Sequence, residues 1–322
     1  MVYNKYIGII GGTGTIGSII VKYLLQLQTH FHVLIGGRRS IKEISMSTFY
    51  NSERLKYNQM NYNNDVELDN FCSQCLLVIN AVGPSFKIND KIALHALRNN
   101  CHYIDIGGYG ILRDLLKPYE KSIEAQKLCF IIGVGWMPGI SGVFSKTIIE
   151  THLNSPENTN FNIYYGAVDN WSYSSTYDLA ASSMGKTHSY VYSHGKEIQV
   201  SPFRYTHHKF FPFIGHKKIC MPSFDEQLTQ LATSLKQIRK ISTFIMLNDY
   251  ISMGKFMFIK IFYKHNLNKA TLMLQDDYQR LVKKENKWGS VICQVSKIEP
   301  ERKIDTFYYL YLSLIHISEP TR

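Results

Sequence analysis

The residues best suited to chemistry are glycines near the start of the chain, within GIIGGTGTIGS at residues 8–18. Gly12, Gly14 and Gly17 fit the G-x-G-x-x-G spacing, in which they allow a tight turn, a close approach to pyrophosphate and close helix packing, respectively. Gly11 in place of Gly12 gives a G-x-x-G-x-x-G spacing, so the subtype stays open. Free N–H groups and the helix dipole attract phosphate at such a loop. The pattern predicts a dinucleotide site.

A second candidate group follows the next apolar stretch, FHVLIGGRRS. A site for NAD usually carries an Asp or Glu about 20 residues beyond the glycines, where it accepts ribose hydroxyls. Here Arg38, Arg39 and Ser40 take that place, and no acid occurs before Glu43. Guanidinium groups bind a 2′-phosphate in bidentate fashion, whereas a carboxylate repels it. We therefore expect NADP as the cofactor, with NAD as the alternative; the other interpretation is two solvated surface arginines.

We expect these residues to be held by strands that alternate with helices along the chain. YIGII at 6–10 is typical of a buried strand, and a helix with one apolar stripe should follow, formed by Ile16, Ile19, Ile20, Tyr23, Leu24 and Leu27. Further strands are expected in residues 75–84, 102–109 and 129–139, with helices in 91–100 and 118–128. Strands that alternate with helices over about 140 residues predict an α/β fold with a Rossmann-type, doubly wound parallel sheet. Its ligands should bind at the carboxyl ends of the strands, near 80–85, 105–108 and 135–139.

The second half has a different pattern, which predicts a mixed α+β domain. Strands are expected at 160–168, in a hairpin at 189–203 around Ser193-His194-Gly195, and in another hairpin at 288–312. Between them, residues 223–238 open with a capping box at Ser223 and Glu226 and continue with one apolar stripe, formed by Phe224, Leu228, Leu231, Leu235 and Ile238. We expect residues 1–140 to bind NAD(P) and residues 141–311 to cover the cofactor and the substrate.

The composition of the chain limits the classes of partner that we expect it to bind. Lys plus Arg exceed Asp plus Glu by 36 to 25, but no run of five like charges occurs, so the charge of +11 does not predict nucleic-acid binding. The apolar region 241–263 is interrupted by charges and is too broken for a membrane span. Cys72 and Cys75 lack a second pair, which favours buried thiols over a metal site. We expect a cytoplasmic protein with a small-molecule substrate and without a metal, and a homodimer stays open.

In its first half the chain resembles the saccharopine dehydrogenase-like oxidoreductases. The stretches that carry the resemblance, in this order, are GIIGGTGTIGS, GGRR, VINAVGPSF, HYIDIGGY and GVGWMPGIS, and KWGSVICQVSK resembles a strand of that family's second domain. The more specific part is the combination of Gly83-Pro84, Tyr103-x-Asp105 and Pro138-Gly139. The resemblance implies an NAD(P)-linked enzyme that transfers hydride to or from a carbon–nitrogen bond of an amino-acid-derived imine or secondary amine. An enoyl or carbonyl reductase on the same fold and a non-catalytic dinucleotide-binding protein are the alternatives.

The resemblance also implies site residues. The pyrophosphate would be bound by Gly12, Thr13, Gly14, Thr15 and Ile16, and the 2′-phosphate by Arg38 and Arg39. Ala81, Val82, Gly83 and Pro84 would lie beside the nicotinamide ribose. Ser85 and Asp105 would face the substrate, where a buried carboxylate pairs with an amine that has lost its water. An Asp that caps the following glycine turn is the alternative for Asp105.

An imine reductase needs an acid near the nitrogen. Among five histidines between 188 and 216, His188 is the first to test as a proton donor, with Tyr177 and Asp178 as its neighbours. Water or the substrate itself would serve equally, so the catalytic acid is left unassigned.

The last eleven residues, LSLIHISEPTR at 312–322, resemble a translated sequencing adapter. They follow the strand TFYYLYL without a turn. We expect the sequence to be a gene fragment with an artefactual tail.

Overall fold

The computed structural model describes residues 5–27, 30–40, 52–108, 110–153, 156–184, 189–223, 226–263, 265–298 and 302–312. The chain divides into two compact units, residues 1–135 and 136–322. Each unit is described by itself below. His188 and residues 313–322 of the expected tail lie outside the described residues.

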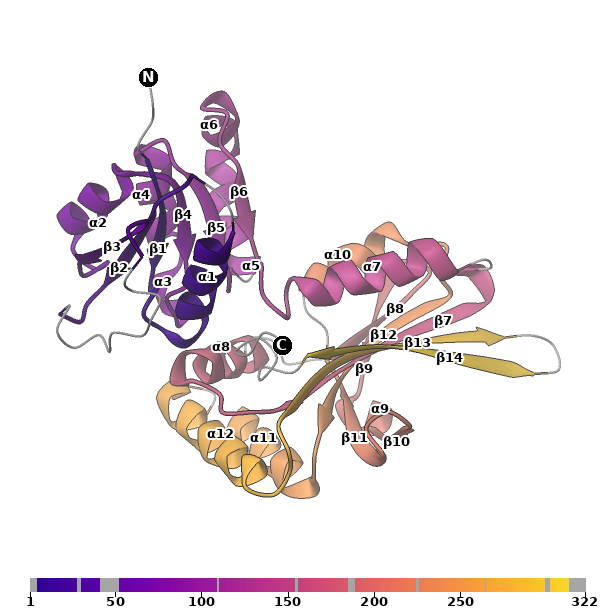
Figure 1. Ribbon diagram of the computed structural model, residues 1–322. Helices are drawn as coiled ribbons and strands as arrows, with labels where there is room; N and C mark the ends of the chain where they lie inside the picture. The colour runs from indigo at the N-terminus through magenta and orange to yellow at the C-terminus, as the bar shows by residue number, and fades with distance from the viewer. Residues whose placement is uncertain are drawn as a thin grey trace. The chain divides into compact units, whose positions relative to one another are not determined.

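The first unit is built on a six-stranded parallel sheet in the order β3-β2-β1-β4-β5-β6 (Figure 1). The strands are β1 (Tyr6–Ile10), β2 (Val33–Gly37), β3 (Leu55–Gln59), β4 (Cys75–Asn80), β5 (His102–Asp105) and β6 (Phe130–Ile132). The helices are α1 (Thr15–Gln26), α2 (Asp65–Cys72), α3 (Ser85–Ile88), α4 (Lys91–Arg98), α5 (Gly110–Leu116) and α6 (Glu120–Ala125), with a 3-10 turn at Lys117–Tyr119. This strand order confirms the predicted Rossmann-type sheet.

Alternation along β1 separates two apolar layers. Ile9 packs with Val21 of α1, whereas Ile10 packs in a cluster with Phe71 of α2 and Leu112 of α5. Successive side chains of a strand point to opposite faces, so one sheet receives helices on both sides. The sheet is therefore doubly wound, as predicted.

The predicted apolar stripe of α1 is partly wrong. Ile16 and Tyr23 are 42% and 45% exposed, and Leu27 is also exposed. The core face instead carries Gly17 and Val21, with Ile20 and Leu24 partly buried beside them. The apolar residues of α1 are spread around more than one face, so they fit more than one stripe, and the contact of Gly17 with the loop chooses among them.

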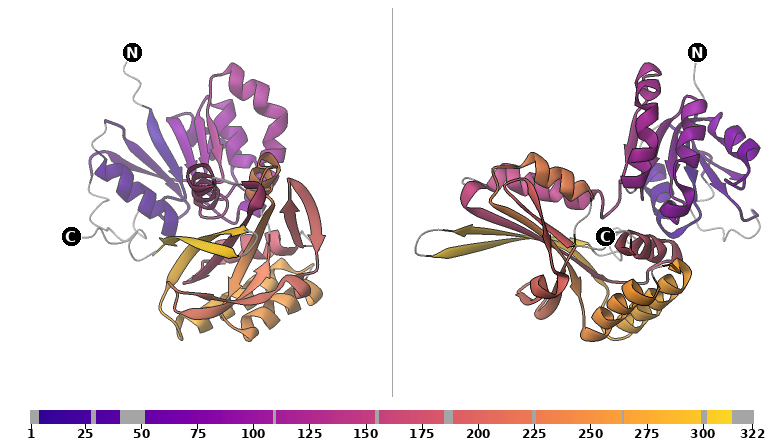
Figure 2. Two further views of the ribbon diagram at one scale, coloured as in Figure 1. Left: turned by 90° about the vertical axis from the view of Figure 1, so that its right-hand side faces the viewer. Right: turned by 180° about the vertical axis from the view of Figure 1, so that it is seen from behind.

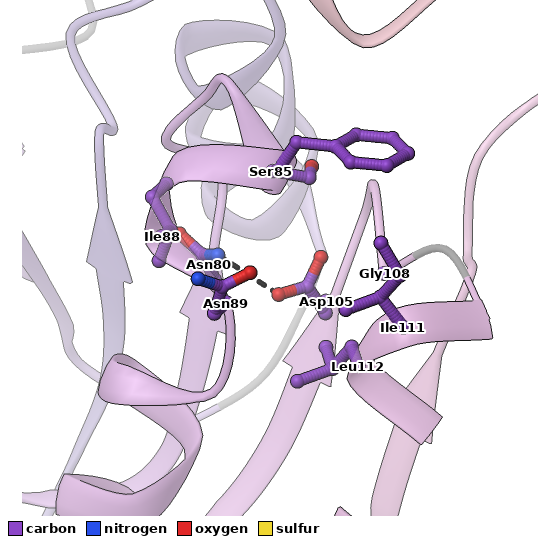
Figure 3. A pocket seen from close by; sticks show the side chains of 9 residues that line it. Asn80, Ser85, Ile88, Asn89, Asp105, Gly108, Ile111 and Leu112 are labelled. Atoms are coloured by element: carbon purple, nitrogen blue, oxygen red, sulfur yellow. Dashed lines mark hydrogen bonds between the residues drawn. The ribbon is translucent and has the colours of Figure 1, made fainter. Parts of the chain in front are cut away.

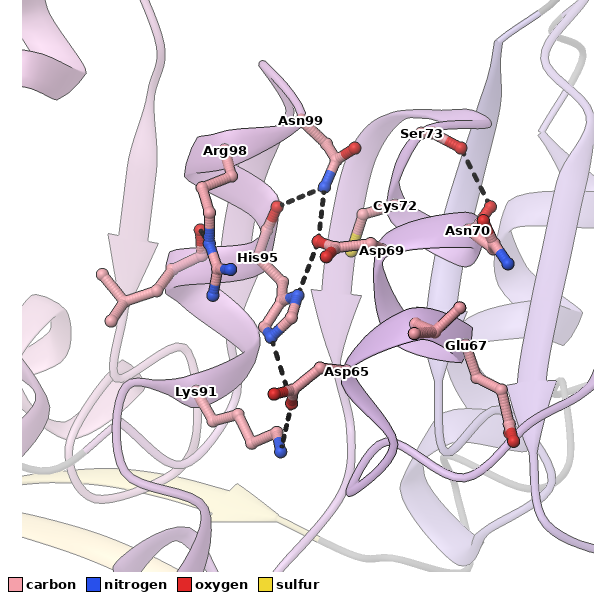
Figure 4. A network of polar contacts seen from close by, with 12 residues as sticks. Asp65, Glu67, Asp69, Asn70, Cys72, Ser73, Lys91, His95, Arg98 and Asn99 are labelled. Carbon is pink, nitrogen blue, oxygen red and sulfur yellow. Dashed lines mark hydrogen bonds and ion pairs between the residues drawn. The ribbon is translucent and has the colours of Figure 1, made fainter.

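A polar seam fixes α2 against α4 (Figure 4). His95 is 1% exposed, and its Nδ1 lies 2.6 Å from Asp69 Oδ1 while its Nε2 lies 3.5 Å from Asp65 Oδ1. Lys91 Nζ lies 2.6 Å from the same Asp65 oxygen, and Asn99 donates to Asp69 Oδ1 at 3.0 Å. Burial raises the pKa of Asp69, but hydrogen bonds from His95 and Asn99 outweigh it and lower that pKa below its usual value. The seam holds α4 in place immediately before β5.

The second unit is a mixed sheet with helices on both faces, as predicted (Figures 1 and 2). Its strands are β7 (Thr159–Val168), β8 (Ser189–Ser193), β9 (Lys196–Val200), β10 (His207–Phe211), β11 (His216–Pro222), β12 (Lys240–Leu247), β13 (Trp288–Ile298) and β14 (Lys303–Leu312). Their main order is β10-β11-β12-β7-β13-β14, and β8 pairs with β12 and β9. The pair β12–β7 is parallel and the other pairs are antiparallel.

The helices of this unit are α7 (Ile140–His152), α8 (Tyr173–Met184), α9 (Pro202–Tyr205), α10 (Glu226–Ser234), α11 (Tyr250–Phe262) and α12 (Leu267–Val282), with a 3-10 turn at Pro156–Asn158. Helices α7 and α10 pack with Ile163 of β7, whereas α8, α11 and α12 pack with Met221 of β11. The apolar region 241–263 becomes β12 and α11. None of the helices in the described ranges is long and apolar enough to cross a bilayer.

The helix expected at 223–238 is shorter than predicted. Helix α10 ends at Ser234, and Phe224 lies outside the described residues. Leu235 and Ile238 still join the core, from the turn that leads into β12. Ile238 N donates to the carbonyl of Leu235 at 3.0 Å, which closes this turn. The apolar spacing therefore marks burial correctly but not the end of the helix.

Candidate functional site

The glycine loop joins β1 to α1, and Gly11 takes its tight turn. Gly11 has φ of +84°, a conformation that favours glycine, whereas Gly12 does not. A side chain on Gly17 would overlap the carbonyl oxygen of Gly11. A Cβ on Gly12 would lie 2.8 Å from Ile35 Cγ2, so Gly12 serves close packing on β2. The structure thus favours the G-x-x-G-x-x-G spacing of Gly11, Gly14 and Gly17. The tight turn that the G-x-G-x-x-G spacing assigns to Gly12 is made by Gly11 instead.

The start of α1 leaves its amides available to an anion. Gly14 is the residue before the helix and makes no side-chain capping bond, and the first turn carries no acidic residue. Thr15 and Ile16 are exposed in this turn. Unpaired N–H groups at a helix N-terminus bind phosphate through hydrogen bonds and the helix dipole. This loop therefore fits the pyrophosphate of a dinucleotide.

The end of β2 presents the two arginines next to the loop. Arg38 and Arg39 are exposed, and in the described part of the chain no acidic side chain forms an ion pair with either. Their backbone is held from β3, because Tyr57 Oη donates to the Arg39 carbonyl at 2.5 Å and Gln59 Nε2 donates to the Arg38 carbonyl at 3.4 Å. Ser40 directly follows them and is partly buried. Two guanidinium groups free of carboxylates suit a 2′-phosphate.

The end of β4 closes the other side of the glycine loop. Ala81 N donates to the carbonyl of Ile10 at 2.9 Å. A Cβ on Gly11 would lie 2.9 Å from Val82 Cγ2 and 3.0 Å from the carbonyl carbon of Ala81. Gly83 and Pro84, joined by a cis peptide bond, lead into α3. The glycine loop, the arginines and the segment 81–84 thus lie at the carboxyl ends of three neighbouring strands.

Asp105 ends β5, beside this segment. It is 2% exposed and lines a pocket with Ser85, Asn89 and Ile111 (Figure 3). Ser85 begins α3, and a Cβ on Gly107 would overlap its hydroxyl oxygen, so the serine lies close over the turn that follows Asp105. The structure brings together the two residues that were expected to face a substrate.

Two side chains hold one oxygen of the Asp105 carboxyl group. Tyr103 Oη donates to Asp105 Oδ2 at 2.5 Å, and Asn80 Nδ2 donates to the same atom at 2.8 Å. Asp105 Oδ1 is buried and accepts no hydrogen bond from the described residues. Burial raises the pKa of Asp105, while the hydrogen bonds from Tyr103 and Asn80 and the nearby amides of Gly107 and Gly108 oppose that rise.

Sequence reasoning placed residue 80 at the ligand-binding edge of the sheet and used Tyr103 in the family resemblance, but it gave neither Tyr103 nor Asn80 a role beside Asp105. Tyr103 lies two residues before Asp105 on one strand and therefore on the same face. Asn80 is the one polar residue in the apolar strand CLLVIN, and it lies opposite Asp105 in the β4–β5 register. A polar residue at the carboxyl end of an apolar strand is the signal that would have found it.

Of the remaining acid–base candidates, the structure describes Tyr177 but not His188. Tyr177 is nearly buried on α8, in the second unit, and Asp178 beside it is also buried. His208 Nε2 lies 2.8 Å from the hydroxyl of Tyr250. Within the described ranges no three His, Cys, Asp or Glu residues are grouped to hold a metal ion. The choice between Tyr177 and His188 stays open, because His188 lies outside the described residues.

The cysteine pair is buried, as predicted. Cys72 ends α2, Cys75 begins β4, and both are free thiols in the apolar core. Cys101 lies with them, and its Sγ donates to the carbonyl groups of Cys72 and Cys75 at 3.1 and 3.2 Å. Burial raises the pKa of Cys101 to about 11. Such thiols stay protonated and pack as small apolar side chains.

A parallel sheet in this order, with a glycine loop after its first strand, defines a Rossmann-type dinucleotide-binding protein. Residues 7–129 match the family model of the saccharopine dehydrogenase NADP binding domain. Residues 7–129 thus form an NADP-binding domain like that of saccharopine dehydrogenase, which identifies an NADP-dependent oxidoreductase and confirms the predicted cofactor.

One solved structure extends the likeness in fold to both units. The structure of an apo saccharopine dehydrogenase (L-Glu forming) from Saccharomyces cerevisiae matches with a TM-score of 0.62 at 14% identity, over 96% of this chain and 86% of that one. A short-chain dehydrogenase/reductase (wide type) from Veillonella parvula, in complex with NADP, matches with a TM-score of 0.31 at 19% identity, over 40% of this chain and 67% of that one. No curated protein matches the chain.

Proposed function

We propose that this oxidoreductase transfers hydride between NADP and the carbon of a carbon–nitrogen bond, in an imine or secondary amine derived from an amino acid. The observation that carries the proposal is the Asp105 carboxyl group in the pocket beside segment 81–84: its buried Oδ1 accepts no hydrogen bond from the described residues, although the backbone amides of Gly107 and Gly108 lie near the carboxyl group. Burying a carboxylate oxygen without a donor of its own is costly, so such an atom favours a ligand that brings a positive N–H group. A protonated imine or amine nitrogen is such a group.

In this proposal the residues have separate roles in cofactor binding and in substrate binding. The amides at the start of α1 and the Arg38–Arg39 pair bind the phosphates of the cofactor, which supplies or accepts the hydride when it is bound. In the reducing direction the imine carbon gains hydride, the carbon–nitrogen double bond becomes single, and the nitrogen keeps the proton of the iminium form. Asp105 Oδ1 accepts the N–H of that nitrogen and stabilises its charge. Ser85, which lies over the turn after Asp105, bounds the same pocket.

The name of the yeast structural match supports the same class, because saccharopine is a secondary amine formed from two amino-acid units. That likeness in fold agrees with a substrate of this chemical type. The expectations of a small-molecule substrate and a cytoplasmic location form part of this proposal.

The test is NADPH oxidation, followed at 340 nm, with a panel of keto acids or aldehydes mixed with amino acids. Enoyl and simple carbonyl compounds form a second panel. We expect turnover only where an imine can form, and we expect Asp105→Asn to lower kcat/KM by about 100-fold, since a charged hydrogen bond is replaced by a neutral one. Turnover confined to the second panel would identify an enoyl or carbonyl reductase. Tight NADPH binding without any turnover would indicate a non-catalytic protein.

A further inference from the structure

We propose that Tyr103 and Asn80 are positioning residues that occupy Asp105 Oδ2 together and so reserve Oδ1 for the nitrogen of the substrate. This inference rests on the proposed function, because it names how that site orients its ligand. Tyr103 acts on the site through Asp105, whereas Asn80 contacts both Asp105 and the backbone of segment 81–84.

The two oxygens of the Asp105 carboxyl group differ in their hydrogen bonding. Both oxygens of Asp105 lie in a buried environment, yet the two donors converge on Oδ2, at 2.5 Å from Tyr103 Oη and 2.8 Å from Asn80 Nδ2. Oδ1 receives none in the described part of the chain. Figure 3 shows the free oxygen directed toward the side of the pocket where Ser85 lies. A carboxyl group held at one oxygen has its rotation fixed, so the direction of its other oxygen is fixed as well.

The orientation of Asn80 is set by the cofactor segment. Val82 N donates to Asn80 Oδ1 at 3.0 Å, which leaves the amide nitrogen of Asn80 facing Asp105. The backbone carbonyl of Asn80 accepts from Ile106 N at 3.3 Å. One chain of hydrogen bonds therefore runs from the backbone of segment 81–84 through Asn80 to Asp105. A shift of this segment would be transmitted to the carboxyl group.

The hydroxyl of Tyr103 acts as a permanent donor. Burial raises the pKa of Tyr103 well above its usual value, and the facing Asp105 carboxylate raises it further. Its ring is fixed in the core, where it lies 5.4 Å from the ring of Phe130. Among the described residues, Tyr103 is the titratable side chain that hydrogen-bonds to Asp105, and the Cys72 thiol of α2 raises the pKa of Tyr103 further. Removing the hydroxyl leaves the carboxylate less stabilised, so the pKa of Asp105 should rise.

The experiment compares Tyr103→Phe with Tyr62→Phe in the whole protein. Tyr62 packs against the same core and lies outside the site, so it controls for the loss of a hydroxyl. NADPH affinity, from fluorescence titration, should be unchanged in both, which shows that both are folded. For Tyr103→Phe we expect kcat/KM for the imine substrate to fall about 10-fold and its acid limb to move up by about one pH unit, since one donor to the carboxylate is lost. Tyr62→Phe should do neither.

A second measurement does not depend on turnover. In protein labelled with ¹³C at aspartate carboxyl groups, the NMR titration of Asp105 should move to higher pH in Tyr103→Phe, and addition of ethylammonium should move it to lower pH in the parent protein. If these shifts occur while no imine is reduced, the positioning inference holds and the proposed function fails. If Tyr103→Phe leaves both the Asp105 titration and the acid limb unchanged, the inference is overturned.

If the Tyr103→Phe variant does not fold, the Asn80→Ala variant provides the same test. It removes the other donor and also the acceptor of Val82 N, so we expect the same upward shift of the Asp105 titration together with NADPH affinity about 3- to 10-fold weaker, from the loss of a hydrogen bond in the cofactor segment. A normal Asp105 titration in this variant would equally contradict the proposal.

Discussion

At the scale of single residues, the glycine loop depends on the absence of particular side chains. Gly17 lies where any Cβ would overlap the carbonyl oxygen of Gly11, and that oxygen belongs to the turn that we expect to bind the pyrophosphate. Neither atom can move without shifting backbone, since Gly11 N also donates to the carbonyl of Gly36 at 2.8 Å.

We therefore expect Gly17→Ala to lower the free energy of unfolding by about 1–3 kcal/mol, from overpacking, and to weaken NADPH binding as the loop shifts. Urea unfolding and fluorescence titration measure the two effects. Gly254→Ala is the matched control, because Gly254 lies within α11 with no atom within 4 Å of its added Cβ. That change should stabilise the protein by up to about 1 kcal/mol, through helix propensity. Equal behaviour of the two variants would contradict the packing argument.

We expect the arginine pair Arg38–Arg39 to decide between NADP and NAD. Replacing both Arg38 and Arg39 by Ala should weaken NADPH binding by about 10- to 100-fold, the value of a lost charge-assisted hydrogen bond, and should leave NADH binding nearly unchanged. Isothermal titration with both cofactors measures this. An equal loss for NADPH and NADH would show that the pair does not bind the 2′-phosphate.

At the scale of elements, a half-buried ion pair joins α12 to Asp249, the residue that caps α11. Arg280 of α12 binds Asp249 through two nitrogens, at 2.6 and 2.9 Å, and also donates to Asp277 at 2.9 Å. Asp249 caps α11 as well, since it accepts from Ser252 N at 2.8 Å. The hydrogen bonds from Arg280 lower the pKa of Asp249 to about 2.

This lowered pKa predicts how the contribution of Asp249 to the free energy of unfolding changes at acid pH. The folded Asp249 loses its charge near pH 2 and the unfolded one near 3.9, so its contribution is present above about pH 4 and disappears as the pH falls toward 2. Asp249→Asn should therefore lower the free energy of unfolding by about 1–2 kcal/mol at pH 7, after allowance for screening by solvent, and by little near pH 2. Urea unfolding across this pH range measures the difference.

Asp276→Asn is the matched control for Asp249→Asn. Asp276 pairs with Lys255 at 2.8 Å, but its side chain is exposed to water, so its loss should cost much less. If both variants lowered stability equally at pH 7, or if the loss in Asp249→Asn did not depend on pH, the argument from Arg280 would be wrong.

The apolar periodicity of the sequence predicted where most of the assigned elements lie. It did not predict which face of α1 is buried or where α10 ends. In α1 the predicted stripe included Ile16 and Tyr23, and both are exposed. In α10 the spacing continued to Ile238, beyond the last helical residue Ser234. Apolar spacing reports which residues become buried, whereas the face and the end of a helix are chosen by what packs against it.

At the scale of the whole molecule, each of the two compact units has its own apolar core. The residues that fit NADP lie in the first unit, so bound cofactor should stabilise that unit. We expect two transitions in calorimetry, and NADPH at 100 times its Kd should raise the stability of one of them by about 2.7 kcal/mol. A single transition that shifts as a whole would show that the units unfold together and would contradict this expectation.

The sequence by itself determined the parallel sheet, its glycine loop and the class of cofactor. These features depend on local signals: short apolar strands, glycines at fixed spacing and two arginines where an acid would otherwise stand. Only the tertiary structure decided that Gly11 takes the turn, and that Tyr103 and Asn80 converge on one oxygen of Asp105. The physical reason is that Asn80 and Asp105 are 25 positions apart in the chain and meet only through the register of β4 and β5, which no local pattern specifies.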